Sequence, residues 1–350
     1  MKGKEAMKEE VYYSEQAASA EKKKRKKKSK AKSYVITTIF LLLSIVVGYT
    51  IGRLQYQFEA AMLLVNRDVK SDLDSVDVGE YNLISSDKVV NILLIGTDKR
   101  SYSTEDGRSD STMIATIDGK HKRLKVSSLM RDMYVSIPGY EDNRFNAAYS
   151  YGGVTLLYKT IAQNFGIKLD GFVQVDFVDF KKVINEMGGV KVELTQWECD
   201  WLKRKYPDYG RAQKLKAGTN NLNGWLALSY SRIRYDENGD FGRTQRQRNI
   251  LEGMFRKIKS LPNSKLQQIM KNVLKNVKTD LTNKEILSYI SNVLFMGTME
   301  IDQFRLPVDD GYTDETIRGM EVLVLDLEKN KKALSDFIFE YDGEKEETKE

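Results

Sequence analysis

The sequence predicts an α/β domain whose sheet is covered by helices on both faces, preceded by one transmembrane helix. Short apolar runs rich in β-branched residues recur after residue 88, and such runs are typical of strands buried on both faces. Between them lie stretches with apolar residues at three-to-four spacing, which indicate amphipathic helices. An uncharged apolar segment at residues 34–52 precedes them all.

The first 33 residues form a basic tail. They hold 12 Lys and Arg against 5 Glu, which leaves 44 basic and 45 acidic residues in the rest of the 350-residue chain. The formal charge of +6 therefore belongs to the tail, and the domain itself is near neutral. This distribution argues against a nucleic-acid-binding domain, because anionic lipid headgroups explain a basic run beside an apolar segment.

Residues 34–52 are expected to cross the cell membrane once, as a helix. Such a helix comes close to the ~30 Å thickness of the hydrocarbon core. Basic residues crowd its N-terminal side and only Arg53 follows closely, so the N-terminus is placed in the cytoplasm and the domain outside. A cleaved signal peptide is the alternative, but the leader and the apolar run are both long for a signal.

The remaining chain is predicted to hold an extracytoplasmic stalk at residues 53–87, one catalytic domain at 88–340 and a disordered tail at 341–350. Strands are predicted at 89–96, 111–117, 124–129, 134–137, 172–177, 190–194, 301–306 and 321–325. Helices are predicted at 145–153, 154–165, 177–187, 222–231, 244–261, 265–277, 284–296 and after residue 325. Residues 195–216 are expected to form a loop whose aromatic side chains pack or stack on sugars, with packing favoured.

The most informative window for function is residues 231–248. It holds five Arg and no Lys, although Lys outnumbers Arg 38 to 18 over the whole chain. Guanidinium pairs bidentately with phosphate oxygens whereas ammonium is a point charge, so this inversion indicates a phosphate site. Arg232 and Arg234 are expected on one face of an extended segment. Arg243 is expected to open the next helix, whose N-terminus favours anions.

An ion-pair network is the alternative explanation of these arginines. The acidic residues available in the same window are Asp236, Glu237 and Asp240. In this interpretation Arg246 and Arg248 are solvated on a helix surface.

A second group of charges stands at predicted strand ends. Asp98 and Arg100 follow the first strand, and Asp110 opens the next one. Ligands of open α/β sheets bind beyond the carboxyl ends of strands, so these residues lie where chemistry is expected. Two carboxylates together with substrate phosphate oxygens suit Mg²⁺. The alternative is that both Asp residues only stabilise turns.

Arg131 and Asp132 follow the strand at 124–129 and repeat this geometry, with Asp132 either a base or a group that orients Arg131.

Several absences narrow the class of protein further. His121, the single His, is predicted in a turn, which argues against a Ser-His-Asp triad or a His-rich metal site, and the lone Cys199 excludes a Cys-based metal site. No phosphate-binding P-loop is present. An enzyme on the outer face of the membrane finds little ATP. The free energy for the reaction must therefore come from a bond of its own substrate, and a pyrophosphate bond would supply it.

Taken in order, these motifs resemble the LytR-CpsA-Psr family of cell-envelope proteins. The matching stretches are residues 91–100, 107–110, 131–132, 137–139, 145–153, 188–190, 222–224 and 231–247, which include Gly107-Arg-Ser-Asp110 and Gly239-Asp-Phe-Gly-Arg-Thr-Gln-Arg-Gln247. The single N-terminal anchor matches too. The sequence departs from the family at Leu129-Met130, where Ile-Pro is common, and at Ser111, which shifts the following motif by one place.

The resemblance implies a three-layer α-β-α domain around a mixed central sheet, with an apolar pocket for a polyprenyl tail. It implies a phosphotransferase that moves a phosphate-linked anionic glycopolymer, such as teichoic acid or capsule, from a polyprenyl-pyrophosphate carrier to peptidoglycan. Asp98 and Asp110 are then expected to hold Mg²⁺. The implied pyrophosphate-binding residues are Arg100, Arg108, Arg131, Arg232, Arg234, Arg243 and Gln247, and the implied catalytic residues are Asp98, Arg131, Arg232, Arg234 and Asp240.

The residue that takes the proton of the acceptor stays open, and Asp98, Asp132 and Asp240 are the candidates. Three other functions also stay open at this point. A polyprenyl-pyrophosphate hydrolase would release lipid phosphate without an acceptor. A lipid-carrier binding protein would bind the same ligand without catalysis. A DNA-binding transcriptional attenuator would need the domain itself to bind DNA.

Overall fold

The computed structural model describes residues 66–67, 73, 76–79, 81–98, 109–236, 239–262, 265, 268–269, 272, 277–298 and 300–340. All of them belong to Ala61–Glu350, the second of the two compact units into which the chain divides. The predicted basic tail and transmembrane helix fall in the first unit, Met1–Ala60, outside the described residues. Among the helices that are described, none has both the length and the apolar character that a membrane crossing requires.

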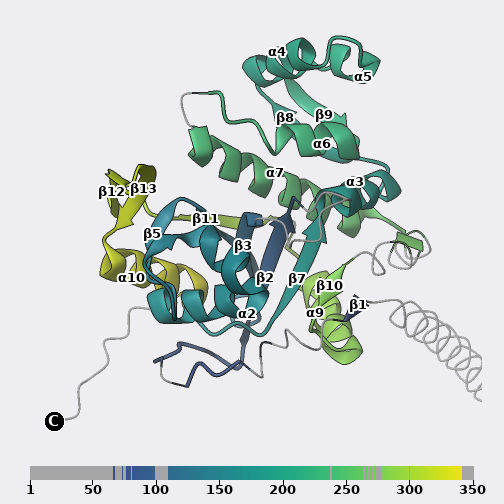
Figure 1. Cartoon of the computed structure of the whole chain (residues 1–350). Coiled ribbons are helices and arrows are strands. Elements are labelled where there is room, and N and C mark those ends of the chain that lie inside the picture. The colour runs from purple at the N-terminus through teal and green to yellow at the C-terminus, as the bar shows by residue number, and fades with distance from the viewer. Residues whose placement is uncertain are drawn as a thin grey trace, which may run out of the picture. The chain divides into compact units, whose positions relative to one another are not determined.

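A seven-stranded mixed sheet forms the centre of the described domain (Figure 1). Its strand order is β1 (Asn66–Arg67), β10 (Lys278–Thr279), β7 (Gly171–Asp176), β2 (Val89–Thr97), β3 (Ser109–Asp118), β4 (Arg123–Leu129) and β11 (Asp302–Leu306). β2 pairs in parallel with β7 and antiparallel with β3, and β4 pairs antiparallel with β3 and in parallel with β11. The carboxyl ends of β2, β4, β7 and β11 therefore lie at one edge, together with the start of β3.

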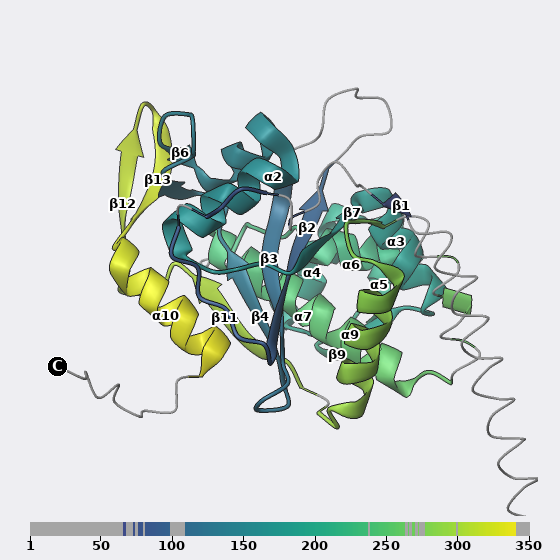
Figure 2. The same cartoon turned by 90° about the horizontal axis from the view of Figure 1, so that it is seen from below.

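Helices cover both faces of this sheet, as Figures 1 and 2 show. On one face α2 (Phe145–Phe165) and α10 (Leu327–Phe339) bury residues such as Leu157 and Leu334 against Leu93 and Ile114. On the other face α7 (Gly239–Ser260) and α9 (Asn283–Phe295) pack on Ile117. A sheet with two apolar faces needs such cover. The predicted α/β class with a mixed sheet is thus confirmed.

Two smaller sheets accompany the central one. β12 (Tyr312–Ile317), β13 (Met320–Leu325), β5 (Met133–Val135) and β6 (Asn143–Arg144) form the first, and β8 (Val190–Leu194) and β9 (Gly218–Leu222) the second. The strands predicted at 134–137, 190–194 and 321–325 therefore exist but lie outside the central sheet. β12 lacks a buried apolar run, since four of its residues are exposed, and the sequence did not reveal it.

The loop predicted at residues 195–216 is wrong, because this segment contains α4 (Gln196–Lys205) and α5 (Gly210–Gln213). Thr195 and Glu198 form a capping box that starts α4. Together with α6 (Gly224–Tyr230) these helices lie in the upper part of the view in Figure 1, and their buried side chains contribute to a second apolar core. Trp201, Tyr206 and Tyr209 pack on that core, as the favoured interpretation held, whereas Trp197 of the same segment is 37% exposed and does not.

The connection from α6 to α7 differs from its prediction. α6 ends at Tyr230, and residues 231–236 form a turn and irregular backbone instead of the expected extended segment. α7 starts at Gly239, five residues before the predicted start at 244, so the expected Gly-Asp-Phe-Gly turn is its first helical turn. Gly239 has a φ of +47°, which glycine adopts without the clash that a Cβ would bring.

The described residues of the predicted stalk contact the domain. β1 pairs with β10, and the amide of Leu73 donates to Asp280 Oδ2 at 3.0 Å. The amide of Ile84 donates to the carbonyl of Gly166 at 2.7 Å.

The helix predicted at 265–277 lies mostly outside the described residues. The α3 (Phe177–Glu186) that follows β7 begins with Asp176, whose side chain caps it.

Candidate active site

Charged side chains predicted from the sequence gather at the carboxyl edge of the sheet. Asp98 directly follows β2, Asp110 lies at the start of β3, and Arg131 follows β4. Because β2 and β3 are antiparallel neighbours, the two carboxylates stand at adjacent strand ends. Arg100 and Arg108, which belong to the connection between these strands, lie outside the described residues.

The first turns of α7 supply the other half of the site. Asp240, Arg243 and Gln247 are three and four residues apart and therefore share one face of the helix. That face is directed at the sheet edge: Asp240 Oδ2 lies 3.2 Å from Arg131 Nε, and Gln247 Oε1 accepts a hydrogen bond from the Ser111 hydroxyl at 3.1 Å. The structure thus brings together residues from β3, β4 and α7.

Asp240 holds three guanidinium groups. Its carboxylate oxygens lie 2.8 Å from Arg243 Nη2, 3.2 Å from Arg131 Nε and 3.4 Å from Arg234 Nε. Burial alone would raise the pKa of Asp240, but a hydrogen bond with Asp132 and the three arginines outweigh it and lower the pKa. Asp240 is therefore a carboxylate that fixes the arginines in place.

Arg243 is the buried member of this set, with 3% of its surface exposed. Burial lowers the pKa of Arg243 to about 10. The positive charges of Arg131 and Arg234 also lower it, whereas the negative charge of Asp240 opposes the shift. Nη2 binds Asp240, but Nε and Nη1 have no hydrogen-bond partner in the described part of the chain. Buried donors without partners are costly. Arg243 therefore presents N–H groups suited to an anion.

An apolar cavity of about 360 Å³ adjoins these charges. Its walls include Leu94, Val173, Phe180, Ile250 and Met254, from β2, β7, α3 and α7. Its polar lining consists chiefly of Asp110, Ser111, Arg232, Arg234, Arg243 and Gln247. The guanidinium carbon of Arg232 lies 4.8 Å from the ring centroid of Phe177, a cation–π contact. The cavity therefore offers apolar walls and a cationic lining to one ligand.

Asp132 lies on the other side of Arg131. It accepts a hydrogen bond from Arg131 Nε at 3.3 Å and lies 3.6 Å from Arg144 Nε. Burial raises the pKa of Asp132, and the hydrogen bond and charge of Asp240 raise it further, against the attraction of Arg131 and Arg144. In this carboxyl pair Asp240 keeps the charge and Asp132 holds the proton more readily.

Two arginines of the predicted cluster do not belong to this site. Arg246 and Arg248 are each 6% exposed, so the interpretation that they are solvated is wrong. Arg246 pairs with Asp236 and, at 2.7 Å, with Glu198 of α4, which confirms the ion-pair alternative for this residue. Arg248 Nη1 donates to the Ser128 hydroxyl at 2.9 Å. Burial lowers the pKa of Arg248 to about 10, and the charge of Arg305 adds to this.

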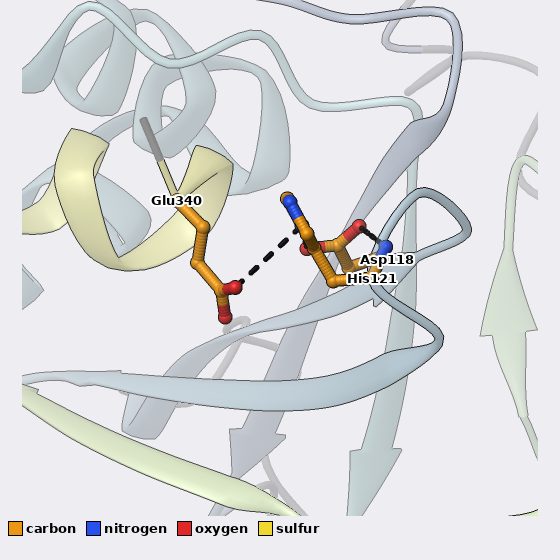
Figure 3. Close-up of side chains that lie close together, drawn as sticks. All are labelled: Asp118, His121 and Glu340. Atoms are coloured by element: carbon orange, nitrogen blue, oxygen red, sulfur yellow. Dashed lines mark hydrogen bonds and ion pairs between the residues drawn. The ribbon is translucent and has the colours of Figure 1, made fainter. Parts of the chain in front are cut away.

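Asp118, His121 and Glu340 form a cluster of metal-ligand type that the sequence did not reveal (Figure 3). Their ligand atoms lie within 4.8 Å of one another, so the group could hold a metal ion. However, the ammonium of Lys125 lies 2.8 Å from Asp118 and 3.0 Å from Glu340 and already provides both carboxylates with a counter-charge. A bound ion would have to displace this buried lysine. His121 lies in the turn after β3, where it was predicted.

Asp98 and Asp110 offer a different donor set. Both are partly buried carboxylates at one sheet edge, and Asp110 Oδ1 lies 3.7 Å from Arg131 Nη1. Mg²⁺ favours such oxygen ligands and completes its shell with water and phosphate oxygens. The residues present therefore fit Mg²⁺ in kind, provided that a phosphate ligand contributes.

A sequence model of the LytR_cpsA_psr family matches residues 53–336. The regulatory protein MsrR of Staphylococcus aureus (strain COL) is 32% identical over 281 residues, which cover 77% of this chain and 81% of MsrR. The polyisoprenyl-teichoic acid–peptidoglycan teichoic acid transferase TagU of Enterococcus faecalis is 37% identical over 195 residues, which cover 55% of this chain and 61% of TagU.

Solved structures of TagT have the same fold. TagT bound to LIIa-WTA matches with a TM-score of 0.61 and 28% identity, over 75% of this chain and 98% of TagT. TagT with bound octaprenyl pyrophosphate lipid matches with a TM-score of 0.58 and 27% identity, over 75% and 98% of the two chains.

Proposed function

The chain belongs to the LytR-CpsA-Psr family, and on this basis we propose that it is a phosphotransferase that moves an anionic glycopolymer from a polyprenyl-pyrophosphate carrier to peptidoglycan. One observation carries the proposal: the buried Arg243, with two nitrogens unpartnered in the described chain, lines the same cavity as apolar side chains from four elements. A prenyl pyrophosphate has this combination of a charged head and an apolar tail. The relatives support it, because TagU is named a teichoic acid transferase and TagT binds octaprenyl pyrophosphate.

The roles of the arginines follow from their places. Arg243 and Arg234 sit beside Asp240 in the cavity lining, where they bind the phosphate oxygens bidentately. Gln247 uses Oε1 for Ser111, which leaves its Nε2 to donate to the same anion. Arg232 lies over the ring of Phe177 and lines the same cavity, where its guanidinium stabilises charge on the phosphates. Arg100 and Arg108, which lie outside the described residues, are assigned to the same pyrophosphate-binding set by the family resemblance alone.

The location of the enzyme is part of the proposal. Residues 34–52 anchor it in the cell membrane by one helix, with the basic tail in the cytoplasm and the domain outside. On that side of the membrane the domain meets carrier lipids, whose prenyl tails suit its apolar cavity. Asp98 and Asp110 would hold Mg²⁺, which would supply positive charge to stabilise the phosphates.

The reaction is an in-line displacement at phosphorus. A hydroxyl of the acceptor attacks the phosphorus nearest the glycan, and the bond from this phosphorus to the bridging oxygen breaks. Lipid monophosphate leaves. Arg131, Arg234 and Arg243 stabilise the charge that develops on the phosphates, because Asp240 holds their guanidinium groups in fixed positions.

The test uses the full chain in phospholipid vesicles with Mg²⁺, a polyprenyl-pyrophosphate-linked glycopolymer and soluble peptidoglycan strands. Arg232→Ala and Arg234→Ala are expected to lower the rate of transfer by about 100-fold or more, because each removes charge stabilisation in the transition state. Arg256→Ala is the matched control, since Arg256 lies exposed on α7 and pairs only with Glu252 among the described residues. Rates within twofold of wild type in both cavity variants would contradict the proposal.

A further inference from the structure

A second open cavity, of about 710 Å³, lies against the proposed pyrophosphate site. Its lining includes Arg131, Asp132, Arg144 and Asp240, together with Asp314 and Thr316 of β12, and it is called the acid-lined cavity below. The pair Arg131–Asp240 lines this cavity, and Asp240 also binds Arg234 and Arg243, which line the apolar cavity. Asp240 therefore links the linings of the two cavities through its ion pairs.

The two cavities differ in charge. The apolar cavity has three guanidinium groups and one carboxyl group in its lining. The acid-lined cavity has five carboxyl groups and two guanidinium groups. An anionic donor is attracted to the first and repelled from the second. A neutral polyhydroxyl compound, by contrast, finds many hydrogen-bond acceptors in the acid-lined cavity.

The two carboxyl groups nearest the boundary are not equivalent. Asp240 binds three arginines, which stabilise its charge and make it a weak base. Asp132 lines the acid-lined cavity, and its charged neighbours are Arg131, Arg144, Asp240 and the carboxylates of β12 and β13. Burial and Asp240 raise the pKa of Asp132, which makes its carboxylate the stronger base.

We propose that the acid-lined cavity binds the sugar strand that accepts the glycopolymer, and that Asp132 takes the proton of the attacking hydroxyl. This assignment rests on the proposed function. As the acceptor oxygen bonds to phosphorus, its proton passes to the Asp132 carboxylate, and the electron pair of the broken bond stays on the bridging oxygen of the leaving lipid monophosphate. The proton then leaves through the open cavity to water.

The test measures donor binding and transfer separately with the full chain. Asp132→Asn keeps an oxygen for Arg131 Nε but cannot accept a proton. It is expected to bind octaprenyl pyrophosphate within twofold of wild type, to lose at least 100-fold in kcat and to lose the rise of rate with pH. Asp132→Glu is expected to recover part of the rate. Transfer by Asp132→Asn at a rate and pH profile like wild type would overturn the assignment, and so would a loss of donor affinity as large as the loss of rate.

The acceptor site has its own variant and control. Thr316→Trp fills the acid-lined cavity and is expected to raise the KM for soluble peptidoglycan strands at least fivefold without a change in octaprenyl pyrophosphate affinity. Thr219→Trp, at an exposed position of β9 that does not line this cavity, is the matched control and is expected to behave as wild type. Equal KM values in the two variants would overturn the acceptor site alone. A wild-type chain that binds octaprenyl pyrophosphate but transfers nothing would overturn the proposed function, and this assignment with it.

Discussion

Asp240 Oδ2 lies 2.8 Å from Nη2 of Arg243, and this contact joins the most buried arginine of the site to the carboxylate that organises it. The pair stands at the N-terminal turn of α7, where it faces the carboxyl edge of the central sheet. Because the other nitrogens of Arg243 lack partners among the described residues, the contact fixes the guanidinium without using all its donors. The predictions below follow from this arrangement and from its surroundings.

Removal of Asp240 is expected to destabilise the fold. Asp240→Ala leaves Arg243 buried without its counter-charge, and breaking a buried ion pair in this way costs about 2–4 kcal/mol of the free energy of unfolding. Urea unfolding of the purified variant measures the loss. Asp208→Ala, at an exposed position, is the control and should change stability by less than about 0.5 kcal/mol. Equal unfolding curves for the two variants would show that Asp240 does not compensate Arg243.

Arg243→Met is expected to weaken pyrophosphate binding while it preserves the apolar wall. The variant loses charge-assisted hydrogen bonds worth about 1.5–3 kcal/mol, which corresponds to a loss in affinity of roughly 10- to 100-fold. Calorimetry with octaprenyl pyrophosphate gives the dissociation constants. Affinity for octaprenol, which has no phosphate, should stay within twofold. A parallel loss for both ligands would point to a damaged cavity instead of a lost anion contact.

Met254→Trp tests the apolar cavity. Met254 lines its wall on α7, and a larger ring there is expected to reduce the space for a prenyl tail. Affinity for octaprenyl pyrophosphate should fall at least tenfold, whereas affinity for inorganic pyrophosphate should not change. Arg256→Trp, on the exposed side of the same helix, should bind both ligands as wild type does. The cavity would be irrelevant to the tail if octaprenyl pyrophosphate bound equally well to both variants.

Asp132 should leave a signature in the pH dependence of stability. A carboxyl group whose folded pKa is raised contributes stability below its unfolded pKa of about 3.9, and this stability is lost as the pH rises through the folded pKa. Asp240, whose pKa is lowered, acts in the opposite sense and contributes above that unfolded value. The difference in free energy of unfolding between Asp132→Asn and wild type should therefore increase in favour of the variant from pH 4 to pH 7. Urea unfolding at four pH values measures it, and parallel profiles would contradict the raised pKa.

Lys125 should behave as the cation of the Asp118 cluster. The side chains of Lys125 and Asp118 are both fully buried. Lys125→Met therefore leaves the buried Asp118 carboxylate with His121 alone and is expected to lower the free energy of unfolding by about 3 kcal/mol. Lys332→Met is the control, because its pair with Asp336 is exposed and contributes less than about 1 kcal/mol. Zn²⁺ should raise the Tm of Lys125→Met more than that of wild type. A larger rise in wild type would show that the lysine yields readily to a metal.

Much of the site was predictable because its signals are local. A strand followed by Asp98 or Arg131 can be recognised in the sequence, and antiparallel and parallel pairing then brings such ends to one edge. Helical spacing likewise groups Asp240, Arg243 and Gln247 on one face. Neither inference needs knowledge of distant contacts.

The remaining features depend on contacts between distant segments. Arg246 pairs with Glu198, 48 residues earlier, in a segment that was interpreted as a loop, so its burial could not be foreseen. Lys125 is buried because the end of α10 covers it and accepts its hydrogen bond at Ile338. Residues 231–236 are irregular because they connect the short α6 to the early start of α7. The polar pattern of these residues did not exclude a strand, so the irregular backbone could not be predicted from it.

The fate of one phosphorus atom tests the proposed reaction most directly. A donor labelled with ³²P at the phosphate nearest the glycan is incubated with the full chain in vesicles, Mg²⁺ and soluble peptidoglycan strands, and the label is followed into each product. Phosphotransfer predicts that the label joins the peptidoglycan strands and that one unlabelled lipid monophosphate appears for each polymer attached. Label that stays in soluble glycan phosphate, with lipid monophosphate formed equally fast without peptidoglycan, would show a hydrolase and contradict the account.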